Sequence, residues 1–145
     1  MRHVRASVFV GAVVLMLVGC GDKKKTEKKT ALNKKVQSAC TGDALAAGPK
    51  LPTDFPQLEN VTYTQQSKLG PSEVVEGYYK GDVKAAHDDF KSSLESAKFT
   101  ILFDELEAHD SEVSWKGGGR SGQVALREEC GTNGKTYVHI TNRSE

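Results

Sequence analysis

The chain has 145 residues, a formal net charge of +1 and a mean hydropathy of −0.48. This length allows one compact domain with a small core and excludes a large multidomain enzyme. The sequence shows no internal repeat and no second domain, so it excludes a repeat architecture as well.

The chain opens with a short basic stretch that is followed by an apolar one. Arg2 and Arg5 precede residues 6–19, which are mostly apolar. This stretch has the length of a secretory signal and is too short to span a membrane. We therefore interpret residues 1–19 as a signal peptide and not as an anchor helix.

The run Leu17-Val18-Gly19-Cys20 closes the apolar stretch and resembles the lipobox of bacterial lipoproteins. The resemblance implies transfer of a diacylglyceryl group, with fatty acids such as palmitate, to Cys20 and cleavage just before it. It also implies a lipid anchor in a membrane of the cell envelope, on the extracytoplasmic side. Gly21 is similar to the pattern that permits outer-membrane delivery, and the choice of membrane stays open. The alternative is an ordinary secretory signal, with Cys20 as a bystander.

Residues 20–50 form a lysine-rich segment with almost no large apolar side chains. Seven lysines and two acidic residues lie at 22–35, whereas sixteen acidic and eleven basic residues follow from Lys50 onward. Such a composition buries too little apolar surface to fold. We therefore expect a flexible tether from the lipidated cysteine to an acidic domain at residues 51–145, and no nucleic-acid partner. The tether either attracts anionic headgroups or only spaces the domain from the membrane.

Two cysteines, Cys40 and Cys130, remain once Cys20 is assigned to the lipid. In an oxidising compartment an even pair predicts one disulfide. It would close a loop of roughly ninety residues and contribute about 4–5 kcal/mol in the chain-entropy model. The alternatives are two free thiols, or Cys130 as a nucleophile near His139, a role that the exported context disfavours.

The acidic domain begins with an extended arm and two strands. Two prolines keep residues 51–58 extended, which leaves the large apolar side chains of this arm free to dock on a core. Residues 61–65 and 72–79 are rich in β-branched and aromatic side chains, and a turn signal at 69–71 separates them. They predict a pair of strands. The docking side chains are those of Leu51, Phe55 and Leu58.

A helix and four further strands complete the prediction. Asp82 is a candidate N-cap, and apolar residues recur at helical spacing over 83–98. The glycine-rich residues 117–122 predict a hairpin, and Asn133-Gly134 predicts a second one. The pattern predicts an α+β fold of order ββαββββ, with a single helix on one face of an antiparallel sheet of five to six strands. The four strands are expected at residues 99–107, 112–116, 123–129 and 137–142.

The domain also resembles a broad group of small bacterial exported domains. The resemblance rests on the Phe-Pro arm at 54–56, on Phe90 and Leu94 of the helix, and on the strand that follows 97–99. It covers residues 51–142. Members of this group are mostly uncharacterised, so the resemblance implies the fold and no activity.

Few residues suggest chemistry, and we expect no cofactor. Ser121 lies in a glycine-rich turn with neither a nucleophile elbow nor the helix N-terminus that a phosphate loop needs. Glu105, Glu107 and His109 would project to one side of a strand and form a candidate metal site. Their alternative role is a charged edge that blocks aggregation. Residues 87–89 point in three directions around the helix and are predicted to be solvated surface.

One helix covers only one face of a sheet, so the other face needs a partner. In the last strand Val138 and Ile140 alternate with Tyr137 and His139, which predicts an aliphatic inner face and an amphipathic outer one. Tyrosines on an open face of the sheet are suited to binding a partner. The alternative is that strand pairing places some of these tyrosines in the core. The candidate partner-binding residues are Tyr137, His139, Tyr63 and Tyr79.

The leading hypothesis is a membrane-anchored, non-enzymatic envelope lipoprotein that binds a protein or another envelope component. Two alternatives stay open. One is a metal-dependent or hydrolytic envelope enzyme, and the other is a structural spacer lipoprotein.

Overall fold

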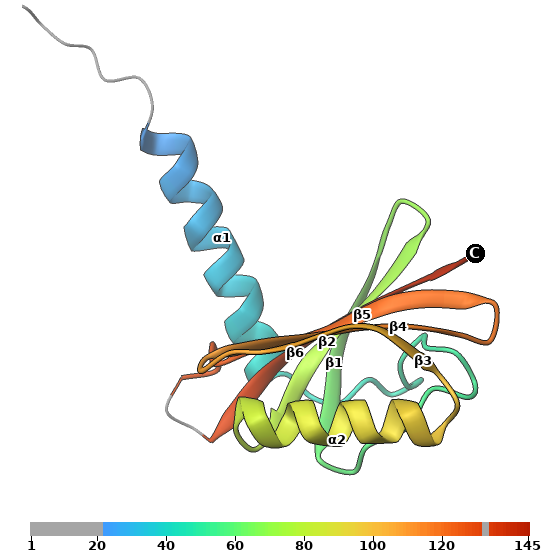
Figure 1. The fold of residues 1–145 in the computed structure, drawn as a ribbon. Helices are drawn as coiled ribbons and strands as arrows, with labels where there is room; N and C mark the ends of the chain where they lie inside the picture. The colour runs from blue at the N-terminus through green and yellow to red at the C-terminus, as the bar shows by residue number, and fades with distance from the viewer. Residues whose placement is uncertain (1–21, 132–133) are drawn as a thin grey trace, which may run out of the picture.

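The computed structural model of the protein describes residues 22–131 and 134–145. This part of the chain forms two helices and six strands (Figure 1). In chain order they are α1 (Asp22–Thr41), β1 (Val61–Leu69), β2 (Ser72–Lys80), α2 (Val83–Ser96), β3 (Thr100–Leu106), β4 (Asp110–Gly117), β5 (Arg120–Arg127) and β6 (Lys135–Ser144). The predictions made for residues 1–19, Cys20 and Asn133 concern positions outside the described residues.

The six strands form one antiparallel sheet in the order β1-β2-β6-β5-β4-β3. The last strand of the chain therefore lies inside the sheet, and β1 and β3 form its two edges. The predicted α+β class and single antiparallel sheet are confirmed. The prediction of a single helix is wrong, because α1 precedes the ββαββββ pattern.

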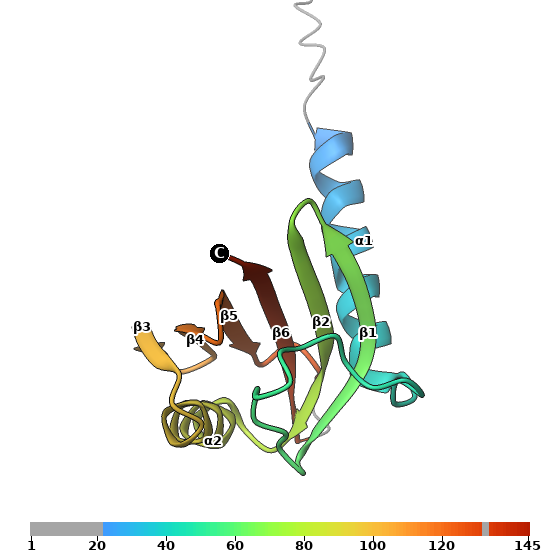
Figure 2. The same ribbon diagram turned by 90° about the vertical axis from the view of Figure 1, so that its right-hand side faces the viewer.

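The helix α2 begins where the sequence indicates. The Asp82 side chain accepts a hydrogen bond from the Ala85 backbone amide at 2.7 Å and caps the first turn. The apolar face of α2 is buried against β3, β4 and β5. Figure 2 shows α2 beneath these three strands, while α1 runs beside β1 and β2 at the other end of the sheet.

The main core lies between the sheet and α2, and the arm at residues 51–58 closes it. Phe55 is buried against Phe99 and Trp115, with ring centroids 6.0 and 5.4 Å away. Leu51 and Leu58 pack against the same cluster and are partly buried. The predicted docking of this arm is confirmed.

The hairpin predicted at residues 117–122 is present as a tight turn between β4 and β5. Gly117 still pairs with Arg120, so only Gly118 and Gly119 lie outside the strands. Both have positive φ angles, 59° and 68°, which favour glycine.

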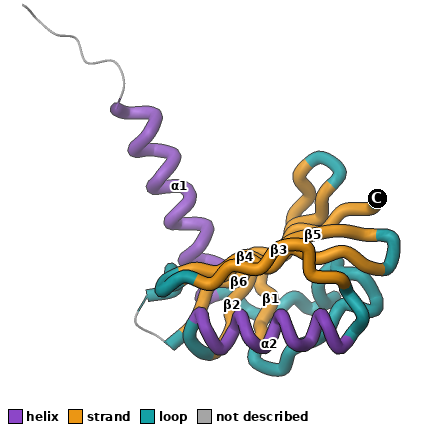
Figure 3. The backbone as a smooth tube through the Cα atoms, in the orientation of Figure 1, coloured by secondary structure: helices purple, strands orange, loops and turns teal. Residues whose placement is uncertain are grey.

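The second face of the sheet is partly covered by α1, as the tube in Figure 3 shows with a helix on each side of the sheet. Val36, Ala39 and Cys40 are buried there in a small cluster with Cys130 and Tyr137. The segment expected to be a flexible tether is thus helical over Asp22–Thr41. Composition was misleading because lysine, alanine and glutamine are good helix formers. Val36, Ala39 and Cys40 are spaced i, i+3 and i+4, so they share one face of α1, and this face packs the last turns of the helix on the sheet.

The predicted pairing of Cys40 with Cys130 is present in the structure. The two residues are 90 positions apart in the sequence, and their Cα atoms are 5.4 Å apart. This disulfide joins the end of α1 to the segment that leads into β6.

Removing the disulfide should destabilise the protein without changing the strand order. We expect Cys40→Ala/Cys130→Ala to lose about 2–4 kcal/mol of stability and on the order of 10 °C in Tm. Thermal unfolding followed by circular dichroism measures this. Reduced wild-type protein should match the double variant, and an unchanged Tm in both would contradict the structural role of the bridge.

Candidate functional site

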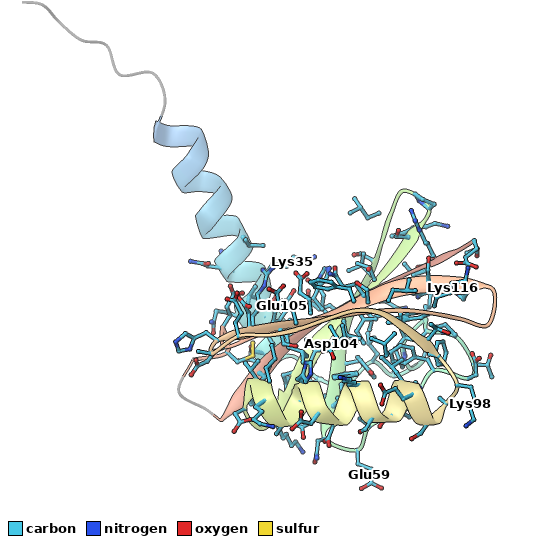
Figure 4. The ribbon with its side chains drawn as sticks, in the orientation of Figure 1. Lys35, Glu59, Lys98, Asp104, Glu105 and Lys116 are labelled. Atoms are coloured by element: carbon cyan, nitrogen blue, oxygen red, sulfur yellow. A yellow bond between two sulfur atoms is a disulfide. The ribbon has the colours of Figure 1, made fainter. Side chains whose placement is uncertain are left out.

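A buried carboxylate lies on the sheet face that α1 covers. Glu76 of β2 is opposite His139 of β6 in the strand register. Tyr137 Oη donates a hydrogen bond to Glu76 Oε1 at 2.5 Å, and His139 Nδ1 lies 3.5 Å from the same oxygen. Lys35 of α1 places its Nζ 2.7 Å from Glu76 Oε2. We call these four residues the Glu76 cluster, and Figure 4 labels Lys35 at the foot of α1.

The partners of Glu76 keep its carboxyl group ionised. Burial alone raises the pKa of this carboxyl, but hydrogen bonds with His139, Lys35 and Tyr137 outweigh burial and lower the pKa from 4.5 to about 2. Burial and the neighbouring carboxylate raise the pKa of Tyr137 well above its usual range. At neutral pH, therefore, Tyr137 is a hydroxyl donor and Glu76 is an ionised acceptor.

The Glu76 cluster holds α1 on the sheet and leaves little room for a substrate. Both the carboxylate and Tyr137 are buried, and Lys35 covers the second carboxylate oxygen. Breaking such a buried pair by removing one partner is costly, because an uncompensated charge remains. The cluster is thus a docking contact between α1 and the strands β2 and β6.

Three of the four residues that we expected to form a partner-binding surface are buried. Tyr137, Tyr63 and Tyr79 are 4%, 7% and 3% exposed, so the prediction of exposed tyrosines is wrong. Tyr63 and Tyr79 face the main core, and Tyr79 Oη donates to Asp89 of α2 at 2.6 Å. Only His139 of this set is partly open to solvent.

For Tyr63 and Tyr79 the reason for burial is strand pairing, which places them in the main core as the alternative expected. For Tyr137 the reason is α1. The aliphatic Val138 and Ile140 do face the main core, and Tyr137 and His139 do share the opposite face. That face is occupied by the chain's own N-terminal helix. The spacing of Val36, Ala39 and Cys40 was the sequence signal for this docking.

A second cluster of polar side chains lies between α2 and the strands β3 and β4. Ser111 Oγ and His87 Nδ1 share a hydrogen bond of 2.7 Å, and His87 Nε2 lies 3.2 Å from Asp104 Oδ1. Lys91 forms an ion pair with the same carboxylate. His87 is buried, so its predicted place on the solvated surface is wrong.

These three residues have the composition of a hydrolase triad but not its accessibility. Ser111 is 1% exposed, and its partner on the imidazole is Nδ1 instead of the Nε2 that a triad serine uses. A nucleophile must reach its substrate. The Ser111, His87 and Asp104 contacts therefore attach α2 to the sheet.

The candidate metal ligands do not converge. Glu105 projects from β3 opposite Glu112, whereas His109 lies in the following turn and pairs with Glu128. Glu107 closes the same turn through its backbone amide, which donates to the Asp110 carbonyl oxygen. In the described ranges, no group of three or more His, Cys, Asp and Glu side chains has an arrangement for a metal ion.

A shallow trough crosses the sheet face opposite α2, beyond the part that α1 covers. Its volume is about 370 Å³, and it extends from Leu69 on β1 to Leu102 on β3. The residues between these ends are mostly small or polar, with Arg143 from β6 among them. The open part of this face is therefore polar in its middle and apolar at its ends.

Comparison with known proteins assigns no relative. No protein-family model matches the chain, and no curated protein matches it.

Neither described helix is both long and apolar enough to cross a membrane.

The Glu76 cluster predicts a pH-dependent stability. Because the pKa of Glu76 in the folded protein is about 2, below its ordinary 4.5, the ionised carboxylate stabilises the fold above that ordinary value. The contribution is lost as the pH falls toward 2. Glu76→Gln should therefore cost about 2 kcal/mol at neutral pH and almost nothing near pH 2.

Thermal unfolding of wild type and Glu76→Gln over this pH range checks the prediction. The difference between the two proteins reports on Glu76 and its direct partners, because carboxyl groups elsewhere in the protein are the same in both. Glu59→Gln, at an exposed carboxylate, is the matched control and should match wild type throughout. A difference between Glu76→Gln and wild type that does not shrink in acid would contradict the assignment.

Proposed function

We propose that this protein is a lipid-anchored lipoprotein of the cell envelope, and that its α+β domain binds a protein or another envelope component without catalysing a reaction. The observation that carries the proposal is the position of α1. This helix begins at Asp22, two residues after Cys20, and its last turns are joined to the sheet by the Cys40–Cys130 disulfide.

The length of α1 would set the distance between a lipid anchor and the domain. A helix of 20 residues is about 30 Å long, since each residue adds about 1.5 Å. In Figure 1 it rises away from the sheet toward its N-terminal end. A lipid on Cys20 would hold the domain away from the bilayer surface at the end of this helix, with a restricted orientation.

Surfaces of the domain outside the α1 contact support a binding role. α1 packs on β1, β2 and β6. The same face of β3, β4 and β5 remains uncovered by either described helix, and one end of the trough lies at Leu102. A spacer without a partner would need neither a disulfide-fixed orientation nor an open sheet face.

Lipidation of Cys20 is the first test. Wild-type protein should partition into the detergent phase, and mass spectrometry should find a lipid-modified cysteine at the mature N-terminus. Cys20→Ala should stay unprocessed or leave the membrane fraction. Cys40→Ala/Cys130→Ala keeps Cys20 and should partition as wild type does. An unmodified Cys20 in the envelope protein would reject the anchor.

The hydrolytic alternative makes an opposite prediction at Ser111. A reactive serine paired with His87 would be labelled by a fluorophosphonate probe, whereas we expect no labelling because Ser111 Oγ is buried under α2. Intact-mass measurement after incubation with the probe decides this. Labelling that Ser111→Ala abolishes would replace the binding role with an enzymatic one.

A further inference from the structure

The two edges of the sheet differ in how their backbone is covered. At β1, the Leu45 amide donates to the Tyr63 carbonyl oxygen at 2.8 Å, and Thr64 Oγ1 donates to the Ala39 carbonyl oxygen at 2.8 Å. The chain that precedes β1 thus covers part of this edge. At β3, within residues 22–131 and 134–145, only β4 forms backbone hydrogen bonds with the strand.

The uncovered strand β3 also carries most of the exposed large apolar side chains in the described residues. Leu102, Phe103 and Leu106 are 59%, 48% and 41% exposed, and they account for three of the five exposed large apolar side chains in the described chain. A bulge after Ile101 places both Leu102 and Phe103 against one residue, Ser114 of β4. An open strand edge with adjacent apolar side chains is a template for pairing with another strand.

The charges along this edge select the kind of strand that fits. Glu105 and Glu112 are directly opposite each other across β3 and β4, and like charges in that position are unfavourable. Among the described residues, neither of them nor Glu107 has an ion-pair partner, whereas Asp104 is paired with Lys91 on the α2 side. Figure 4 shows Glu105 and Asp104 on opposite sides of the sheet.

We propose that the open edge of β3 accepts an extended segment of a partner protein, in which apolar and basic side chains alternate, as a seventh strand of the sheet. The backbone of the segment would pair with β3. Side chains of a paired strand alternate between the two faces of the sheet. Its lysine or arginine side chains would lie on the face of Phe103 and Glu105, where their charged ends neutralise Glu105 and Glu107 and their methylene chains cover Leu102 and Phe103. Its apolar side chains would lie on the other face, next to Leu106. The inference deepens the proposed binding role, on which it rests, by naming the partner's chemistry.

A second copy of this chain fits the edge less well. Two β3 strands paired in parallel register, or antiparallel about Glu105, would bring the carboxylates of both copies together. The domain as a whole is acidic, so association between copies is also opposed at longer range. The carboxylates thus disfavour a copy of the same strand and favour a basic one.

The test uses a synthetic peptide with blocked ends that alternates lysine and valine over eight residues. The protein is the full chain in a non-ionic detergent, and amide chemical shifts and hydrogen exchange are followed by NMR. We expect shifts concentrated in residues 100–106 and slower amide exchange there. Two control peptides separate backbone pairing from simple charge attraction. One replaces lysine with glutamate, and the other keeps the lysines but carries N-methyl groups on alternate amides.

Variants of exposed residues locate the contact. Glu105→Gln/Glu107→Gln should weaken peptide binding about threefold or more, because two exposed ion pairs are lost. Phe103→Ser should weaken it by about as much, through lost apolar contact. Leu69→Ser, at a side chain that is 73% exposed and lies on the other edge strand, is the matched control and should bind as wild type does.

Three results would overturn the proposal. The first is equal binding of the glutamate or N-methylated peptide, and the second is a set of shifts centred on Arg143 and the trough instead of β3. The third is a dimer, seen by sedimentation without peptide, that Phe103→Ser abolishes. Lipidation of Cys20 is measured separately, so loss of the β3 site with an intact anchor rejects this inference alone. An absent anchor with peptide bound at β3 rejects only the anchor.

Discussion

The attachment of α1 to the sheet determines which surfaces of this protein are open. A six-stranded sheet has two faces, and α2 packs against only one of them. The disulfide between Cys40 and Cys130 joins the last turn of α1 to the segment before β6, and Val36, Ala39 and Tyr137 pack around it. Because this cluster is small, the covalent bond supplies a large part of what holds the helix there.

The Glu76 cluster adds a polar contact with a defined geometry. Apolar contacts alone are non-directional and would allow α1 to slide or rotate on the sheet. A buried carboxylate that contacts a lysine from the helix and a tyrosine and a histidine from β6 favours the position of α1 that keeps these contacts. The net gain in stability from such a buried pair is modest, whereas a misplaced helix would leave the charge unpaired. We infer that Glu76 specifies the position of α1 more than it strengthens the fold.

The strands and α2 were predictable because local patterns and tertiary packing agree there. Asp82 caps the helix as its position suggests, and the alternation in β6 separates Val138 and Ile140 from Tyr137 and His139 as expected. The role of the tyrosines was not predictable in this way. Tyr63 and Tyr79 lie on the core face, whereas Tyr137 lies on the opposite one. Alternation assigns a side chain to a face but does not say what covers that face, and Tyr137 is covered by a segment whose composition resembles a disordered tether.

The long-range polar contacts could not be predicted from the sequence. Ser111, His87 and Asp104 are brought together only when α2 packs across β3 and β4. Glu76 and Lys35 are 41 positions apart in the sequence, and no motif links them. The open edge at β3 likewise depends on the strand order, in which β6 inserts between β2 and β5 and leaves β3 at the end.

Amide hydrogen exchange along α1, measured by mass spectrometry on the full oxidised chain, tests the central claim most directly. A helix fixed to the sheet should exchange slowly over its last two turns, around Val36 and Cys40, at rates similar to those of the neighbouring strands β2 and β6. Reduction of the disulfide should raise these rates by at least tenfold, roughly the effect of losing 1.4 kcal/mol or more of local stability. Exchange at the rate of an unstructured peptide in the oxidised protein would show that the segment is a flexible tether, and it would contradict the account.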